Sequence, residues 1–135
     1  MSSFRNREYG AQLLDFKGLQ FGKCKATDID LSCDWQGKTF VFVEVKYGTA
    51  PLTMGQRIHL ESLVNAITAG GKTAWAITAR HDTPKGKDIE AATCVVDRVY
   101  GGQNWSLEAQ GRTLKEVMTD LHNVHQLEYT KRSSK

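Results

Sequence analysis

One acidic and one basic residue interrupt a strongly apolar stretch of the chain, and they are the clearest sign of chemistry in the sequence. Residues 39–47 read Thr-Phe-Val-Phe-Val-Glu-Val-Lys-Tyr, in which Glu44 and Lys46 are the only charged side chains. A run this apolar is typical of a buried strand. Because an unpaired charge in a buried strand costs free energy, we expect partners that compensate Glu44 and Lys46.

Residues 28–35 are predicted to form a second strand that pairs with this stretch. The segment alternates strictly between polar and apolar residues, and side chains two positions apart share one face of a strand. Residues 36–38, Gln-Gly-Lys, are typical of a three-residue hairpin loop. This loop length places Asp30 directly opposite Glu44.

Asp30 and Glu44 are therefore expected to form a pair of carboxylates on one face. Directly opposed side chains have Cβ atoms roughly 5 Å apart, and a loop one residue shorter or longer would set Asp30 opposite a valine instead. Like charges at this distance repel, so the pair makes most sense if it shares a divalent cation. Asp28 falls opposite Lys46 on the same face, where it is either a further ligand or the ion-pair partner of the lysine.

The combination of Asp30 with Glu44-Val45-Lys46 resembles the PD-(D/E)xK nuclease superfamily. The similarity spans roughly residues 8–80 and is closest to small single-domain members, such as the archaeal-type Holliday-junction resolvases and phage nucleases. It implies a restriction-endonuclease-like α/β fold, with a mixed central β-sheet flanked by helices. The expected order is an αββαβ core followed by a further strand and a C-terminal helix. The chain departs from the family pattern in having no proline before the acid.

The resemblance also implies a role for each of these residues. Asp30 and Glu44, with the main-chain carbonyl of Val45, are expected to bind Mg²⁺ or Mn²⁺, and Lys46 is expected to assist the attacking water. The residue types suit this chemistry independently of the family, because phosphodiester hydrolysis needs a hard cation and Mg²⁺ prefers carboxylate and water oxygens.

Two accessory residues are expected near the metal by the same resemblance. Glu8 lies in a helix predicted over residues 6–15, and Gln56 lies ten residues beyond Lys46 in a second predicted helix. Each has an ordinary alternative: Glu8 pairs with neighbouring arginines at the surface, and Gln56 serves a capping box with Thr53. Basic residues beside these helices are candidates for phosphate contacts or are ordinary surface residues: Arg5, Arg7, Arg57 and His59.

The acid-x-Lys tripeptide by itself is weak evidence. The chain contains a second match, Asp15-Phe16-Lys17, which follows no acidic strand and lies outside any apolar run. We interpret that match as chance, so the specificity of the first one comes from the hairpin and the opposing acid. The alternative is an ordinary strand pair with a cross-strand salt bridge between Glu and Lys.

The rest of the chain is predicted to complete a single domain over residues 1–129, with residues 130–135 as a disordered tail. Capping boxes begin two helices, one at Thr53 that ends at Gly70 and one at Thr113. Further strands are predicted over residues 73–79 and 93–100. The three tryptophans are interpreted as core residues rather than base-stacking platforms: Trp35, Trp75 and Trp105.

Composition restricts the function classes only loosely. The 135 residues are 40% hydrophobic and 24% charged, which is typical of globular proteins, and the net charge of +3 is compatible with nucleic-acid binding without requiring it. Three widely spaced cysteines match neither a disulfide framework nor a zinc site. No signal peptide or apolar segment of membrane-spanning length is evident, so a cytoplasmic protein without a membrane partner is expected.

Together these features predict a metal-dependent endonuclease that hydrolyses phosphodiester bonds in DNA. A branched or junction substrate and a homodimer are implied by the resemblance alone. The alternatives are a nuclease that acts on RNA and a nucleic-acid-binding or regulatory module on a catalytically degenerate nuclease fold.

Overall fold

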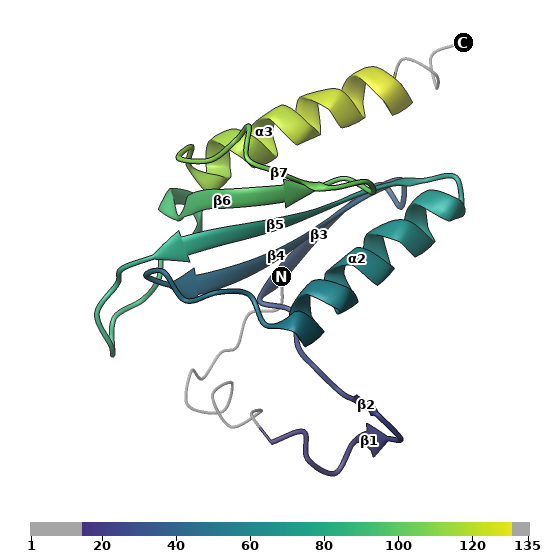
Figure 1. Cartoon of the computed structure of the whole chain (residues 1–135). Helices are drawn as coiled ribbons and strands as arrows, with labels where there is room; N and C mark the ends of the chain where they lie inside the picture. The colour runs from purple at the N-terminus through teal and green to yellow at the C-terminus, as the bar shows by residue number, and fades with distance from the viewer. Residues whose placement is uncertain (1–14, 131–135) are drawn as a thin grey trace.

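A mixed five-stranded sheet with a helix on each face forms the body of the protein (Figure 1). The computed structural model describes residues 15–130. The strand order is β3-β4-β5-β6-β7, with β4 and β5 parallel and all other neighbours antiparallel. The strands are β3 (Leu31–Trp35), β4 (Thr39–Tyr47), β5 (Thr73–His81), β6 (Val95–Tyr100) and β7 (Trp105–Ser106). Helix α2 (Met54–Ala69) connects the parallel pair, and helix α3 (Leu114–His125) follows the last strand.

The hairpin between β3 and β4 has the predicted register. Trp35 pairs with Thr39, and the pairing continues to Leu31 opposite Val43. The three-residue loop is stabilised by a hydrogen bond from the Gly37 N–H to Asp34 Oδ1 at 2.7 Å. Gly37 has φ = 66°, a left-handed conformation that glycine adopts without steric cost.

The first strand of this hairpin is shorter than predicted, because β3 begins at Leu31 and residues 28–30 precede it. The Val45 N–H donates its hydrogen bond to the side-chain Oδ2 of Asp30 at 2.7 Å. A carboxylate thus provides the acceptor where a longer β3 would offer a main-chain carbonyl, which accounts for the early end of the ladder.

Both faces of β4 are buried over most of its length, which explains its apolar sequence. Alternate residues pack into two separate cores, one under α3 and one under α2. The α3 core is built on Val41, Val43, Ile77, Val96, Leu114 and Val117. The α2 core is built on Phe40, Phe42, Leu60, Val64, Ala74 and Ala76.

Both predicted capping boxes are present. In α2 the Thr53 hydroxyl accepts the Gln56 N–H at 3.1 Å, and the Gln56 side chain accepts the Thr53 N–H at 3.2 Å. Thr113 and Glu116 make the same reciprocal pair at the start of α3. These local signals were sufficient to locate the helix starts, because each pair satisfies main-chain donors that a helix terminus leaves free.

A buried histidine attaches the end of α3 to the β3–β4 loop. His125 is 3% exposed, and its two ring nitrogens lie 2.7 Å from Thr39 Oγ1 and 2.9 Å from Gln36 Oε1. Burial, with smaller contributions from the charges of His122 and Lys38, holds the pKa of His125 below its usual value. His125 is therefore a neutral ring with both nitrogens hydrogen-bonded, and it stabilises the attachment of α3 to the hairpin that carries Glu44.

Other parts of the sequence prediction need correction or fall outside the described residues. The structure contains short strands that were not predicted, β1 (Gln20–Phe21), β2 (Cys24–Lys25) and β7, because two-residue strands have no periodicity to detect. A 3₁₀ turn, Ala91–Thr93, precedes β6, and a π-helical turn, Gln126–Thr130, follows α3. Glu8, most of the helix predicted over residues 6–15 and most of the predicted tail lie outside residues 15–130. Within that range no helix is long and apolar enough to cross a membrane.

We expect Gly101→Ala to destabilise the protein. A Cβ atom at Gly101 would lie 2.5 Å from Cζ3 of Trp75, whose ring packs against the α3 core. Overpacking of this kind lowers the free energy of unfolding by about 1–3 kcal/mol, measured by urea denaturation. Gly55→Ala is the matched control, because its Cβ meets nothing within 4 Å and alanine is the better helix former. Equal stability of the two variants would contradict the packing around Trp75.

Candidate active site

Asp30 and Glu44 meet at the end of the hairpin, as the predicted register requires. Glu44 lies in β4 and is 4% exposed, whereas Asp30 is exposed and immediately precedes β3. The two carboxyl groups are close enough for Asp30 to raise the pKa of Glu44. The Val45 N–H holds Asp30 from the main chain of β4 at 2.7 Å, so the position of Asp30 is determined by the strand that carries its partner.

The electrostatics of this pair favour the neutral form of Glu44. Burial, the charge of Asp30 and the hydrogen bond with Asp30 raise the pKa of Glu44 to about 8, while Lys46 lowers it and Asp28 raises it further. With a pKa of about 8, Glu44 is therefore mostly protonated in the metal-free protein at neutral pH. Protonation of Glu44 removes the repulsion that two ionised carboxylates, Glu44 and Asp30, would otherwise have.

This donor set fits a hard divalent cation. Within residues 15–130 there is no group of three or more His, Cys, Asp or Glu residues that could hold a metal ion. The candidate ligands are the two carboxyl groups of Asp30 and Glu44. Mg²⁺ is commonly bound by one or two carboxylates, with water and substrate phosphate oxygens completing the shell. A cation between the two groups would also replace the proton and remove the repulsion that raises the pKa of Glu44.

Lys46 lies two residues beyond Glu44 and therefore projects from the same face of β4. It is partly buried, and no ion pair joins it to Asp28, although the sequence allowed one. Its charge lowers the pKa of Glu44, which places the ammonium group within electrostatic reach of the acid pair.

The two remaining described candidates, Val45 and Gln56, have main-chain or capping contacts. The N–H and C=O of one strand residue point to the same side, so the Val45 carbonyl faces the side of β4 on which Asp30 lies. Gln56 makes the capping box with Thr53 through its N–H and its Oε1. The structural alternative for Gln56 is thus observed, and its contact with a substrate stays a prediction.

The parallel pairing with β5 adds polar residues that the sequence prediction missed. Thr78 lies beside Glu44 and Arg80 beside Lys46, on the face that α2 covers. Arg80 was placed after the strand in the sequence prediction, but β5 continues to His81. The guanidinium of Arg80 donates to the carbonyls of Gly48 at 3.0 Å and Ala50 at 2.7 Å. Arg80 therefore fastens the loop that follows Glu44 and Lys46.

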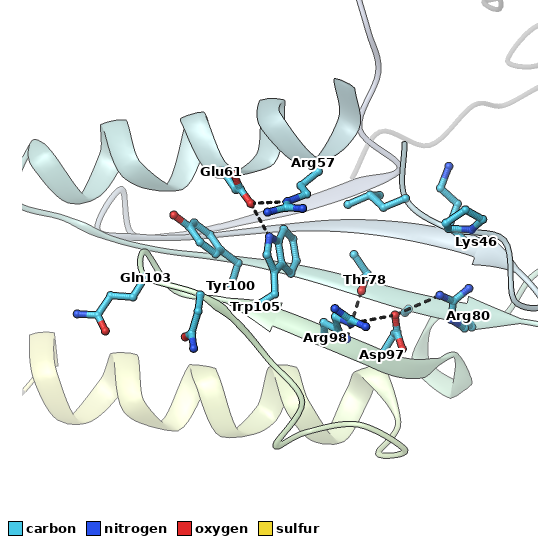
Figure 2. A pocket seen from close by; sticks show the side chains of 14 residues that line it. Lys46, Arg57, Glu61, Thr78, Arg80, Asp97, Arg98, Tyr100, Gln103 and Trp105 are labelled. Atoms are coloured by element: carbon cyan, nitrogen blue, oxygen red, sulfur yellow. Dashed lines mark hydrogen bonds and ion pairs between the residues drawn. The ribbon is translucent and has the colours of Figure 1, made fainter. Parts of the chain in front are cut away.

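Beside Lys46 and Arg80, the face of the sheet that α2 covers contains a pocket of about 560 Å³ (Figure 2). Its wall includes Lys46 at one end and extends over β5, β6 and β7 beneath α2. The charged lining residues are Lys46, Arg57, Arg80, Arg98, Glu61 and Asp97. Lys46 and Arg57 were candidates in the sequence, whereas the positions of Arg80, Asp97 and Arg98 depend on the pairing of β5 with β6, where a bulge between Thr78 and Ala79 has no clear sequence signal.

Comparison with known proteins does not assign this site, since the chain matches no family model, no curated protein and no solved structure. The interpretation of the site therefore depends on its geometry and chemistry.

We expect the stability of the metal-free protein to fall as pH rises through the neutral range. The pKa of Glu44 is about 8 in the folded protein against an ordinary value of 4.5, so the folded state holds a proton that the unfolded state has released. The contribution of Glu44 is complete below its unfolded pKa and decreases by at most about 1.4 kcal/mol per pH unit between the two values.

The measurement is urea unfolding in EDTA at several pH values between 5 and 8, for the wild type and for Glu44→Gln. At pH 5 the two proteins should differ least, because glutamine mimics the protonated carboxyl group of Glu44. As the pH rises the wild type loses stability and Glu44→Gln does not, so the variant should gain stability relative to the wild type. Glu108→Gln, at an exposed loop position, is the control and should retain the wild-type slope. A pH-independent difference for Glu44→Gln would show that Glu44 is ionised in the folded protein.

Proposed function

We propose that the protein is a metal-dependent nuclease of the PD-(D/E)xK type that hydrolyses phosphodiester bonds in DNA. The observation that carries the proposal is the buried Glu44 in contact with Asp30, with Lys46 two residues further along the same face. The mixed sheet, in which α2 connects the parallel strands β4 and β5, is compatible with a restriction-endonuclease-like core, and this finer fold assignment is part of the proposal.

Asp30 and Glu44 would hold Mg²⁺ or Mn²⁺, with the Val45 carbonyl as a further protein oxygen. When bound, such an ion polarises the phosphate and lowers the pKa of a water molecule. The Val45 N–H keeps Asp30 in position through its hydrogen bond to Oδ2. Glu44 would bind the cation in its ionised form, because the cation would supply the positive charge that the proton supplies in its absence.

Lys46 would act on the substrate rather than on the fold. Within the described residues its ammonium group is in no ion pair, so it is available to donate to a non-bridging phosphate oxygen. A positive charge fixed at this point stabilises the charge that develops on the phosphate during hydrolysis. It also orients the nucleophilic water relative to the phosphorus.

DNA is proposed as the substrate, and a junction substrate with a homodimeric enzyme is proposed on the strength of the family resemblance. The positive charges around the pocket beside Lys46 support a polyanionic substrate in general. They are equally suited to RNA, so the assay below includes it.

We expect Asp30→Asn, Glu44→Gln and Lys46→Met each to reduce cleavage by about 100-fold or more, since each removes a charge from the reacting centre. The assay incubates the wild type with single-stranded, duplex and four-way-junction DNA and with RNA, in Mg²⁺, in Mn²⁺ and in EDTA. Cleavage should depend on the metal.

The matched controls are Asp15→Asn and Lys17→Met, which alter the second acid-x-Lys match. Asp15 is exposed and accepts the N–H of Lys17 at 3.0 Å, and neither residue lies in the five-stranded sheet. These variants should keep wild-type activity. Absence of metal-dependent cleavage on every substrate, or full activity in Glu44→Gln, would falsify the enzyme proposal and leave a nucleic-acid-binding module as the alternative.

A further inference from the structure

The pocket beside Lys46 has the size of a small-molecule site. Its volume of about 560 Å³ lies within the about 300–1,000 Å³ that is typical of such sites. Figure 2 shows Lys46 at one end of the pocket and Gln103 at the other, with Trp105 between them. The lining comes from the end of β4, from α2 and from β5 to β7, and Lys46 is the residue that the pocket shares with the proposed catalytic group.

The charges in the pocket favour an anion. Four cationic side chains and two carboxylates line it, which leaves two positive charges in excess. Arg80 has a structural function, because it holds the loop carbonyls described above and pairs with Asp97 at 3.2 Å. Arg98 approaches Asp97 only to 3.9 Å, and its side chain is 54% exposed. The guanidinium of Arg98 therefore has donors available for a phosphate group, which arginine binds in a bidentate manner.

Trp105 forms a pre-oriented aromatic wall in the same pocket. Its indole N–H donates to Glu61 Oε2 at 2.6 Å, and the same oxygen accepts the Arg57 Nε–H at 2.9 Å. These hydrogen bonds, that from Trp105 above all, hold the pKa of Glu61 below its usual value, so Glu61 is ionised. The Tyr100 ring packs 5.3 Å from Trp105, centroid to centroid, and its hydroxyl donates to Asn65 at 2.9 Å.

The polar atoms of Trp105 and Tyr100 are thus hydrogen-bonded within the protein. The two side chains therefore offer the pocket mainly their apolar ring surfaces. Trp105 was interpreted from the sequence as a core residue, and it does pack against the α2 core, but it is only half-buried and also lines the cavity. The amide side chain of Gln103 lies at the end of the pocket opposite Lys46 (Figure 2), and that of Asn104, the next residue, also lines the pocket. Each amide offers donors and an acceptor, which is the pattern that the edge of a nucleobase presents.

From this combination we propose that the pocket binds one nucleotide of the substrate strand next to the scissile phosphate. The phosphate of that nucleotide contacts Arg98 and Arg57, and its base stacks on Trp105 within reach of Gln103 and Asn104. An acidic peptide would use the cations and leave the aromatic wall without a partner, whereas a nucleotide uses both. The inference rests on the proposed function and specifies how that site holds its substrate.

The test measures nucleotide binding separately from cleavage. Calorimetric titrations in EDTA use three probes: deoxyadenosine 5′-monophosphate, deoxyadenosine and inorganic phosphate. The monophosphate should bind more tightly than either of the other two, and its binding should change the tryptophan fluorescence of the wild type but not of Trp105→Phe. Stacking on an aromatic side chain is worth enough that Trp105→Ala should weaken binding about tenfold.

Arg98→Ala should weaken monophosphate binding by a similar factor, about tenfold, and should raise the KM for DNA cleavage more than it lowers kcat. Its matched control is Arg112→Ala. The Arg112 side chain is 42% exposed and pairs with Asp120 at 2.6 Å outside this pocket, so its loss should leave nucleotide affinity unchanged. Trp105→Phe, which keeps an aromatic ring, should retain affinity within about threefold and guards against misfolding of Trp105→Ala.

The outcomes separate this inference from the proposed function. DNA cleavage together with unchanged nucleotide affinity in Arg98→Ala and Trp105→Ala would overturn the pocket assignment and leave the nuclease intact. Inorganic phosphate bound as tightly as the monophosphate would also overturn it, because the site would then recognise an anion alone. Specific monophosphate binding without cleavage of any nucleic acid would support the pocket and contradict the enzyme.

Discussion

The parallel pairing of β4 with β5 determines where the charged side chains of this protein lie. Over nine residues, each residue of β4 stands beside a residue of β5 that projects to the same face. On the face of the sheet toward α2, the amino-terminal half of the two strands is apolar and is covered by Leu60 and Val64 of α2. The carboxyl-terminal half carries Glu44, Thr78, Lys46 and Arg80, and it opens into the basic pocket. A single sheet face therefore provides both the core that holds α2 and the polar surface beyond it.

The charged residues on that surface differ in whether the protein itself provides them with hydrogen-bond or ion-pair partners. Arg80 has carbonyl and carboxylate partners, and it connects the loop after β4 to β6 through Asp97. Glu44 is buried against a second acid, and at neutral pH a proton relieves the repulsion. Burial without a counter-charge costs free energy. In the proposed function a bound cation would supply positive charge to Glu44 beyond that of Lys46, which is the physical reason for proposing a role for Glu44 rather than for Arg80.

The proposed site combines two arrangements with different origins. The acid pair depends on a hairpin, and Asp30 is held by the main chain of the strand that carries Glu44. The pocket depends on side chains that arrive from separate elements, such as Glu61 of α2 and Trp105 of β7, which meet through a 2.6 Å hydrogen bond across 44 residues of sequence. Lys46 belongs to both, because it shares a face with Glu44 and lines the pocket. In the proposed function, Lys46 is the point at which one nucleic-acid strand would contact both parts.

The sequence alone determined the local features of this protein. Loop length and the alternation of two positions per strand were sufficient to predict the register of the β3–β4 hairpin, and reciprocal capping located the starts of α2 and α3. The tertiary structure decided three features that these local rules do not determine. They are the extension of β5 through Arg80, the bulge in the pairing of β5 with β6 between Thr78 and Ala79, and the place of Trp105 in a pocket. These features depend on contacts between distant segments, whose register is set by packing against α2 and α3 and not by any turn that connects them.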